Sequence, residues 1–355
     1  MATSSRSAPI TADLSSLSAY DYALPEAAIA QTPARPRDSA RLLHVRRDGL
    51  GDHRVSDLPG LLREGDLLVV NDTRVIPAQI EARRGAASIG LTLDRPLPDG
   101  TWAALARNAR KLRAGDALTL PHGLTATVVE NHGEGSVILR FAGDPTAEAS
   151  LALPPYIARP EGPTAEDERD YQTVFAAAPG AVAAPTAALH FTPRLLDALV
   201  AAGIGLVRVT LHVGAGTFLP IRTDDITAHR LHAERGEITE AAAEAVTRAK
   251  ARGGRVVAVG TTALRLLETA ARETGPEMGS VRPWAGDTSL YITPGFAFRA
   301  ADLLMTNFHL PRTSLMVLVS AFAGHARIMG AYAHALRLGY RFASYGDASL
   351  LERAA

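Results

Sequence analysis

Four short polar clusters in this chain each follow a run of apolar residues that is typical of a buried strand. The clusters are residues 71–74 (NDTR), 212–217 (HVGAGT), 260–262 (GTT) and 306–309 (TNFH). In open α/β sheets, ligands bind beyond the carboxyl ends of the strands. The clusters therefore predict one ligand site, in which hydroxyl, amide, carboxylate and imidazole groups are available for hydrogen bonding and proton transfer.

Three histidines are the candidates for proton transfer. His212 and His309 lie in two of the clusters, and His190 stands in a run of small residues just ahead of a predicted helix. An imidazole can take up or release a proton near neutral pH. A lone histidine is more often a hydrogen-bonded structural group, and for His190 that alternative stays open.

Two of the clusters contain glycines that would let backbone approach a ligand. The segment LHVGAGTFLP contains Gly214 and Gly216, but it lacks the third glycine of a dinucleotide fingerprint, and Pro220 follows before a helix can begin. This argues against a nicotinamide cofactor and leaves a ligand loop and a plain tight turn as alternatives. Helical periodicity follows residues 260–262, and exposed amides at a helix start attract a carboxylate or phosphate. Simple capping by a threonine is the alternative there.

No metal site is expected from the sequence. The chain has no cysteine, which excludes disulfides, thiolate metal sites and cysteine nucleophiles. His229, His232 and Glu234 lie close together in HRLHAERGEI, but His-x-x-His-x-Glu fits no common zinc pattern.

The elements that position the clusters are predicted as alternating strands and helices. Strand, turn and helix follow one another through residues 191–324, which predicts an α/β fold with a mainly parallel sheet and flanking helices. Within residues 80–141, short alternating stretches separated by Gly, Asp and Pro predict a small antiparallel sheet or barrel. We therefore expect a discontinuous α/β catalytic domain at 1–76 and 150–355, with a β-barrel domain inserted at 77–149.

Bulk composition bounds the class of protein. The 355 residues suffice for two domains, and 47% hydrophobic with 21% charged residues is ordinary for a protein with a sizeable core. Basic and acidic residues number 37 each, so an RNA partner must meet a local basic patch. The N-terminal segment lacks the apolar core of a signal peptide, and the most apolar stretch, 315–324, is too short to span a bilayer. We expect a soluble, cytoplasmic protein without a membrane partner.

The clusters lie within longer motifs that, taken in order, resemble one family. The motifs are YDYALP, IAQTPARPRDSARLL, GDLLVVNDTRVIPA, LPPYIARP, DERDYQTVFA, GAVAAPTAALHFT, VTLHVGAGTF, VAVGTTALRLLE, TNFHLPRTSLMVLVSAFAG and YRFASYGDASL. Over about residues 20–351 the chain resembles the S-adenosylmethionine:tRNA ribosyltransferase-isomerases of queuosine biosynthesis. It departs from the family pattern at Ala188, where glycine is usual, and at Arg312 and Thr313, where lysine and serine are usual. It also lacks an aromatic residue usual after His232.

The resemblance implies an α/β domain carrying an inserted β-barrel, in agreement with the pattern above. It also implies that the ribosyl part of S-adenosylmethionine, used as a co-substrate without a metal, is moved onto tRNA. The acceptor would be 7-aminomethyl-7-deazaguanine at the wobble position, and the products would be epoxyqueuosine, adenine and methionine. We expect a monomer with no obligate protein partner.

Under this resemblance each candidate residue has an expected role. Proton transfer is expected from His190, His212 and His309, with Glu234 as a fourth candidate. S-adenosylmethionine is expected to bind at Gly214, Gly216, Thr217, Thr261, Thr262 and Asn307. The helix start at residues 261–262 would hold its methionine carboxylate. The remaining substrate contacts are expected at Asp72, Thr73, Arg74, Arg265, Arg312 and Tyr345.

Two other classes of protein are alternatives. A methyltransferase that uses S-adenosylmethionine would show an early glycine-rich strand-helix turn followed by an acidic residue for the ribose, which this sequence lacks. A non-catalytic RNA-binding module would show basic and aromatic clustering. The net charge of +0 and the aromatic content of 5% do not supply it.

Overall fold

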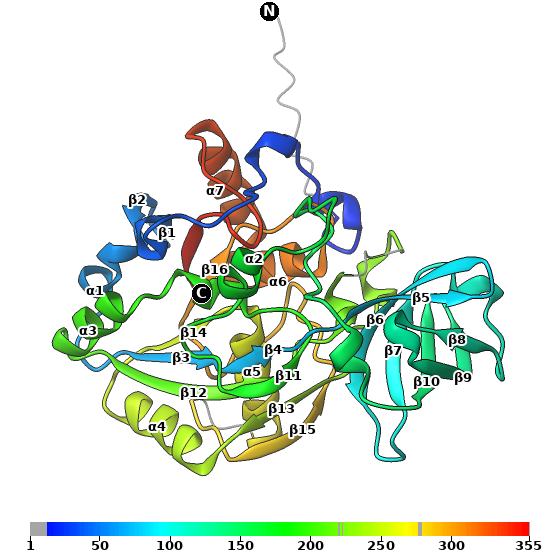
Figure 1. The fold of residues 1–355 in the computed structure, drawn as a ribbon. Helices are drawn as coiled ribbons and strands as arrows, with labels where there is room; N and C mark the ends of the chain where they lie inside the picture. The colour runs from blue at the N-terminus through cyan, green and yellow to red at the C-terminus, as the bar shows by residue number, and fades with distance from the viewer. Residues whose placement is uncertain (1–12, 219–220, 222, 276–278, 355) are drawn as a thin grey trace, which may run out of the picture.

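The computed structural model describes residues 13–218, 221, 223–275 and 279–354. A large sheet with helices on both faces forms the main body, and a closed β-barrel projects from one side of it (Figure 1). In spatial order, the nine strands of the large sheet are β15 (Trp284–Thr288), β13 (Glu234–Ile238), β12 (Gly205–Leu211), β3 (Leu67–Asn71), β14 (Val256–Val259), β16 (Leu303–Asn307), β17 (Ala348–Glu352), β1 (Arg41–Val45) and β2 (Leu50–Arg54).

The large sheet is mixed rather than mainly parallel. The central strands β12, β3, β14 and β16 run parallel, as the alternation of strands and helices predicts. The neighbours β12–β13, β13–β15, β16–β17 and β1–β2 are antiparallel, whereas β17 and β1 are parallel. A parallel pair needs a long crossover between its strands. A tight turn joins β1 to β2, and its Arg46 amide donates to the Gly49 carbonyl at 2.9 Å. That turn imposes the antiparallel pairing.

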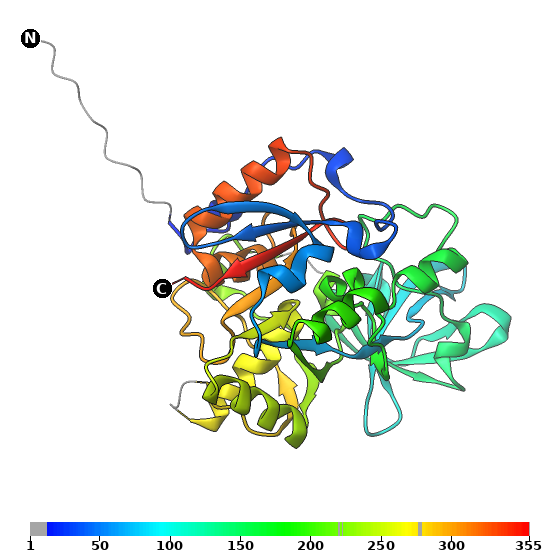
Figure 2. The same ribbon diagram turned by 90° about the vertical axis from the view of Figure 1, so that its left-hand side faces the viewer.

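Both faces of the central strands are buried, because helices cover the sheet on each side (Figure 2). In β3, Leu67 and Val69 belong to one hydrophobic core and Leu68 and Val70 to another. The first core is covered by α4 (Glu240–Ala251), α5 (Thr261–Thr274), α6 (Ser314–Ala323) and α7 (His325–Arg337). The second is covered by α1 (Leu58–Leu61) and α3 (Pro193–Ala201). The continuous apolar runs in the sequence therefore correspond to strands that are packed on both faces.

No single helix in the described ranges is long and apolar enough to cross a membrane. The helices α6 and α7, between which the chain bends by 113°, reach that length and composition only as a bent pair. A further short helix, α2 (Ala165–Asp170), lies outside the two cores.

The barrel is antiparallel throughout and encloses a core of its own. Its strands, in the order in which they pair, are β10 (Ser136–Phe141), β7 (Trp102–Ala106), β6 (Ala87–Pro96), β5 (Gln79–Arg84), β8 (Ala117–Thr119) and β9 (Thr125–Gly133). Val182 and Ala215, which lie outside the barrel in sequence, are buried in the same core. Two short strands form a separate parallel pair: β4 (Thr73–Val75), which precedes the barrel strands in the sequence, and β11 (Ala178–Ala181), which follows them. The domain limits at residues 77 and 149 stay a prediction.

Asp66 ties together the starts of three central strands. Its carboxylate, 1% exposed, accepts from the Arg255 amide at 2.9 Å and from Arg255 Nη2 at 2.6 Å, just before β14. Its carbonyl accepts from the Gly205 amide at 2.8 Å, at the start of β12. Burial would raise the pKa of Asp66, but hydrogen bonds from Arg255 and from the Arg63 amide outweigh it and hold that pKa below its usual value. The strands thus begin in line, and their carboxyl ends reach one edge.

We expect Asp66→Asn to destabilise the protein by about 1 to 3 kcal/mol, because the Arg255 guanidinium, 20% exposed, loses its counter-ion and hydrogen-bond acceptor. Urea unfolding at pH 7 measures this change. The folded-state pKa of Asp66 is depressed. The parent should therefore have the larger unfolding free energy above about pH 4, and this difference should disappear as pH falls through the folded pKa. Asp48→Asn is the control, because Asp48 is 83% exposed in its pair with Arg46 and should cost less than about 1 kcal/mol. Equal midpoints for Asp66→Asn and the parent would contradict the assigned role.

Candidate active site

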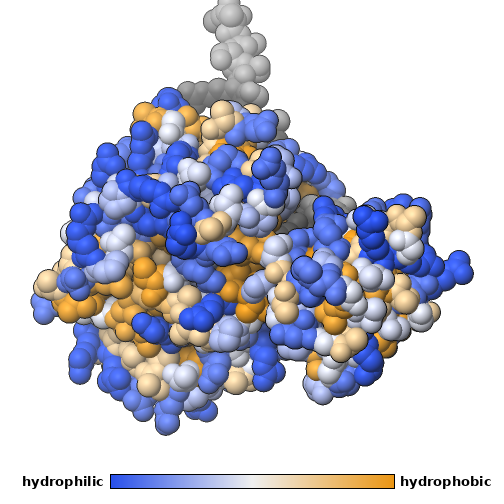
Figure 3. Space-filling model, in the orientation of Figure 1, coloured by the Kyte–Doolittle hydropathy of each residue, from blue (hydrophilic) through white to orange (hydrophobic). Residues whose placement is uncertain are grey.

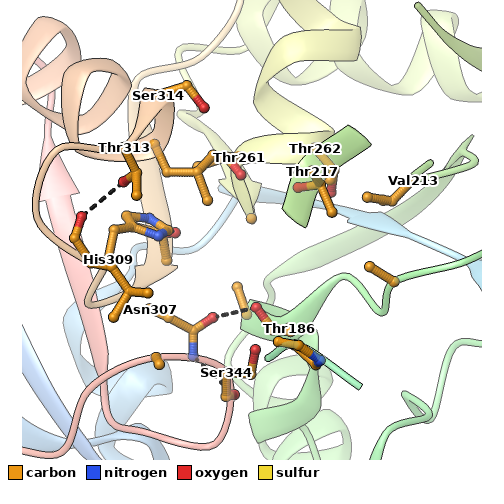
Figure 4. Close-up of a pocket in the computed structure, with 18 of the residues that line it drawn as sticks. Thr186, Val213, Thr217, Thr261, Thr262, Asn307, His309, Thr313, Ser314 and Ser344 are labelled. Atoms are coloured by element: carbon orange, nitrogen blue, oxygen red, sulfur yellow. Dashed lines mark hydrogen bonds between the residues drawn. The ribbon is translucent and has the colours of Figure 1, made fainter. Parts of the chain in front are cut away.

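Two adjoining cavities lie at the edge where the central parallel strands end. The first, of about 460 Å³, is lined by the β14–α5 turn, the end of β16, the start of α6 and several loops (Figure 4). Its polar lining includes Tyr156, Thr186, Thr217, Glu234, Thr261, Thr262, Arg265, Asn307, His309, Arg312, Thr313, Ser314 and Ser344. In Figure 4, Asn307, Thr186 and Ser344 group on one side of the cavity, and Thr261 and Thr262 on the opposite side.

The second cavity, of about 480 Å³, lies between the barrel and the main body. Barrel residues such as Leu105 and Ser136 face the loop of residues 228–233 across it. On the face shown in Figure 3, hydrophilic residues cover most of the surface, and apolar residues gather where the barrel meets the main body. The two cavities share part of their lining, namely Thr217, Glu234, Arg265, Ser314 and Leu315.

A buried ion pair stands in this shared wall. Glu234, the first residue of β13, pairs through Oε2 with Arg265 Nη1 on α5. Its other oxygen accepts from the Gly214 amide at 3.2 Å. Arg265 Nε donates to the Leu290 carbonyl at 2.9 Å. Both carboxylate oxygens of Glu234 are therefore engaged, and its use as a base would require the pair to open.

The helix start predicted to bind an anion lies in the first cavity. Helix α5 begins at Thr261, and its N-cap is Gly260. Gly260 has a φ of 90°, a conformation that suits glycine, and it has no side chain with which to cap the helix. No threonine side chain therefore caps the N-terminus of α5. The Oγ1 atom of Thr262 is buried and has no hydrogen-bond partner among the described residues.

Asn307, the last residue of β16, is fixed in place by its neighbours. Thr186 Oγ1 donates to Asn307 Oδ1 at 2.9 Å, and Asn307 Nδ2 donates to the Ser344 carbonyl at 3.4 Å. His190 lies behind it, with Nε2 3.4 Å from Asn307 Nδ2, and lines neither cavity. Burial and, to a smaller degree, the nearby charges of Arg37 and Arg341 lower the pKa of His190 to about 4. His190 is thus a neutral group that supports Asn307.

Of the three candidate histidines, only His309 lines a cavity. Its Nε2 lies 3.0 Å from Thr306 Oγ1, its amide donates to the Tyr332 hydroxyl at 3.0 Å, and its carbonyl accepts from the Tyr22 hydroxyl. Burial lowers the pKa of His309 to about 3, so the imidazole is neutral at pH 7. A base of that pKa is weak. His309 can hydrogen-bond to a ligand as it stands, whereas efficient proton transfer requires the ligand to raise its pKa.

The structure places His212 and its neighbours elsewhere. His212 Nδ1 lies 2.8 Å from Thr73 Oγ1, and the ring packs against Gly180, where an added Cβ would come within 2.9 Å of it. Burial lowers the pKa of His212. Asp72 accepts from Thr210 Oγ1 at 2.7 Å, and the Arg74 side chain is exposed. None of His212, Asp72, Thr73 and Arg74 lines either cavity.

The glycine-rich loop packs against the barrel. Ala215 donates its amide to Asp94 Oδ1 at 2.7 Å, and a Cβ on Gly214 would lie 2.5 Å from that oxygen. A Cβ on Gly216 would lie 2.7 Å from the His232 ring. Gly214 and Gly216 line the second cavity. Close approach by Asp94 and His232 therefore explains both glycines, and no local sequence signal could have predicted these contacts.

The remaining predicted residues lie at the margin of the first cavity. Arg312 lines it with a φ of 57° and a half-exposed side chain 3.6 Å from Asp21. Tyr345 is buried and does not line it, but its neighbour Ser344 does. Ser344 Oγ lies 2.7 Å from the Tyr156 hydroxyl.

Several lining residues were not among the sequence-based candidates. They are Tyr156, Thr186, Thr313, Ser314 and Ser344. All five lie in motifs that carry the family resemblance, namely LPPYIARP, GAVAAPTAALHFT, TNFHLPRTSLMVLVSAFAG and YRFASYGDASL, so those motifs were the available signal.

No group of three or more His, Asp or Glu residues that could hold a metal ion occurs in the described part of the chain. His229 instead contacts the Tyr291 ring edge-on, with centroids 5.3 Å apart. Metal independence stays a prediction.

Comparison with known proteins defines the family. Residues 17–351 match the family described as "Queuosine biosynthesis protein". The chain is 62% identical over 344 residues to the S-adenosylmethionine:tRNA ribosyltransferase-isomerase of Gluconacetobacter diazotrophicus, covering 94% of this chain and 96% of that protein. It is 59% identical to the protein of the same name from Acidiphilium cryptum, covering 95% and 99%.

A solved structure agrees with these matches. The crystal structure of the S-adenosylmethionine tRNA ribosyltransferase from Thermotoga maritima matches this fold with a TM-score of 0.54 at 34% identity, covering 94% of this chain and 99% of that one. The chain belongs to the S-adenosylmethionine:tRNA ribosyltransferase-isomerase family of queuosine biosynthesis proteins.

Placement of the histidines predicts unequal effects of their substitution. His309→Gln removes an imidazole from the wall of the first cavity and should lower turnover about a hundredfold to ten-thousandfold if His309 transfers a proton. His212→Gln acts outside both cavities and should leave turnover within a few-fold, at a stability cost of about 1 to 3 kcal/mol. Adenine release and melting temperature are measured together. Similar turnover for the two variants would refute this distinction.

Burial of His190 and His309 predicts a pH-dependent stability. Their folded pKa values of about 4 and about 3 lie below the unfolded value of 6.5, so each group's stabilising contribution is present above pH 6.5 and is lost as pH falls through the folded pKa. Each should reduce the unfolding free energy by up to about 1.4 kcal/mol per pH unit in that window. Urea unfolding from pH 7 to 4 should show a flatter slope for the double Gln variant. His122→Gln, at a histidine side chain 85% exposed, should keep the parent slope.

Proposed function

We propose that this protein is an S-adenosylmethionine:tRNA ribosyltransferase-isomerase acting in queuosine biosynthesis. The observation that carries the proposal is the 62% identity, over 94% of the chain, to a relative of that name. Two cavities that meet at a shared wall support it, because the reaction must bring two substrates together.

We further propose the acceptor and the products of the reaction. The ribosyl group would pass to the aminomethyl group of 7-aminomethyl-7-deazaguanine at the wobble position of tRNA, giving epoxyqueuosine with release of adenine and methionine. The ordered motifs along the chain support this choice of acceptor. The protein would act as a monomer in the cytoplasm, without a metal.

The two cavities suggest how the substrates are divided. S-adenosylmethionine would occupy the first cavity, where hydroxyl and amide groups supply hydrogen bonds and where the start of α5 would receive the methionine carboxylate. The residues in contact with it would be Thr217, Thr261, Thr262, Asn307 and His309. The tRNA base would enter the second cavity, past Gly214 and Gly216. The aminomethyl group would then pass the shared wall to meet the ribose in the first cavity, on the side of Asn307 and His309.

The chemistry requires groups of the kind that line the first cavity. A sulfonium makes the protons on its neighbouring carbons acidic, so removal of a proton from the 5′ carbon can drive the loss of adenine. The departing adenine is helped by a hydrogen-bond donor, and the attacking amine must be neutral. His309 is neutral at pH 7 and faces the first cavity, so it is the histidine we assign to the reacting centre.

The products distinguish this reaction from methyl transfer. We expect incubation with labelled S-adenosylmethionine and tRNA bearing the aminomethyl base to release adenine and methionine in equal amounts, with epoxyqueuosine found by nucleoside mass spectrometry. tRNA with an unmodified wobble guanine is the control and should give no product. Formation of S-adenosylhomocysteine together with a methylated nucleoside would overturn the proposal in favour of a methyltransferase.

A further inference from the structure

Arg265 is a buried cation with one free donor. Its residue exposure is 7%, its Nε donates to the Leu290 carbonyl, and its Nη1 pairs with Glu234. Its Nη2 is buried and has no hydrogen-bond partner among the described residues. A buried guanidinium donor without an acceptor is costly, and buried polar groups are nearly always paired. Arg265 lines both cavities, so a ligand in either one could supply the acceptor.

Thr262 provides a second free group on the same face of α5. Residues three apart on a helix are neighbours, so Thr262 and Arg265 face the same way. The Oγ1 of Thr262 is also buried without a partner among the described residues, and Thr262 lines the first cavity. The positive end of the α5 dipole lies at the same place, because the helix begins at Thr261 behind an N-cap glycine.

Glu234 sets the position and net charge of this group. One carboxylate oxygen of Glu234 accepts from Arg265 Nη1 and the other accepts from the Gly214 amide. Glu234 thus fixes the guanidinium in a position in which Nη2 is the donor without a partner. It also cancels the charge of Arg265. Glu234 would therefore repel a dianionic phosphate more strongly than a single carboxylate, and a carboxylate would meet the remaining guanidinium donor, a hydroxyl and the helix dipole.

We propose that Arg265 Nη2 and Thr262 Oγ1, at the start of α5, bind the carboxylate of the methionine part of S-adenosylmethionine. Glu234 is then a positioning residue that holds Arg265, rather than the base that its sequence context suggests. This assignment rests on the proposed function and adds to it the group that recognises the amino-acid end of the co-substrate. It places the sulfonium and ribose farther along the first cavity, on the side of Asn307 and His309.

Decarboxylated S-adenosylmethionine tests the assignment directly, because it lacks only the recognised group. Calorimetry should show that the parent protein binds S-adenosylmethionine about ten- to hundredfold more tightly than the decarboxylated ligand. In Arg265→Gln this ratio should fall to within about threefold, with little change in affinity for the decarboxylated ligand. Thr262→Ala should lower the ratio and Thr262→Ser should keep it.

Two further variants separate recognition from structure. Arg272→Gln, on the same helix but exposed over the Phe296 ring, is the matched control and should keep the parent ratio. Should Arg265→Gln unfold because Glu234 is left buried and unpaired, the double variant Arg265→Gln/Glu234→Gln removes both charges and should show the same lost ratio. Glu234→Gln alone should reduce the ratio, because Arg265 loses its fixed position.

The outcomes distinguish this inference from the proposed function. An unchanged ratio in Arg265→Gln or in the double variant, or an equal loss of affinity for both ligands, overturns the carboxylate assignment while leaving the reaction in place. If the parent binds neither ligand and releases no adenine, the proposed function itself fails.

Discussion

The alignment of the central parallel strands is the constraint on which the rest of the structure depends. The start of α5 follows β14, and Asn307 ends β16, so the first cavity exists only because these strands finish at one edge. Asp66 fixes one end of β3 to its neighbours. At the other end, Asn71 Nδ2 donates to the Leu211 carbonyl at 2.9 Å, and its Oδ1 accepts from the Leu211 amide at 3.0 Å. A one-residue slip would exchange the residues that face each layer.

The antiparallel part of the sheet is equally necessary for the candidate site. Because β13 returns antiparallel to β12, its first residue lies at the edge where β12 ends. Glu234 is that residue, and it reaches Arg265 on α5. In a wholly parallel sheet, the start of β13 would lie at the opposite edge. The antiparallel β13, which the sequence did not predict, thus positions Glu234 in the ion pair at the wall between the two cavities.

Much of this arrangement could be predicted from local sequence. Strand runs followed by polar residues located the α5 start and the end of β16, and alternating stretches located the barrel strands. Contacts between distant segments could not be predicted in this way. The Asn71 side chain hydrogen-bonds to β12. The polar cluster at residues 71–74 therefore connects strands and does not line either cavity. The approach of Asp94 to Gly214 and the support of Asn307 by Thr186 depend on tertiary packing alone.

The burial of Ala215 and Val182 inside the barrel core means that the barrel is not a detachable module. Although its strands are contiguous in sequence, its interior is completed by residues from the loops of the main body. Excision or replacement of residues 77–149 would open a void in whatever barrel took its place and would leave Ala215 without the Asp94 acceptor. Each part therefore limits which substitutions the other tolerates at these contacts.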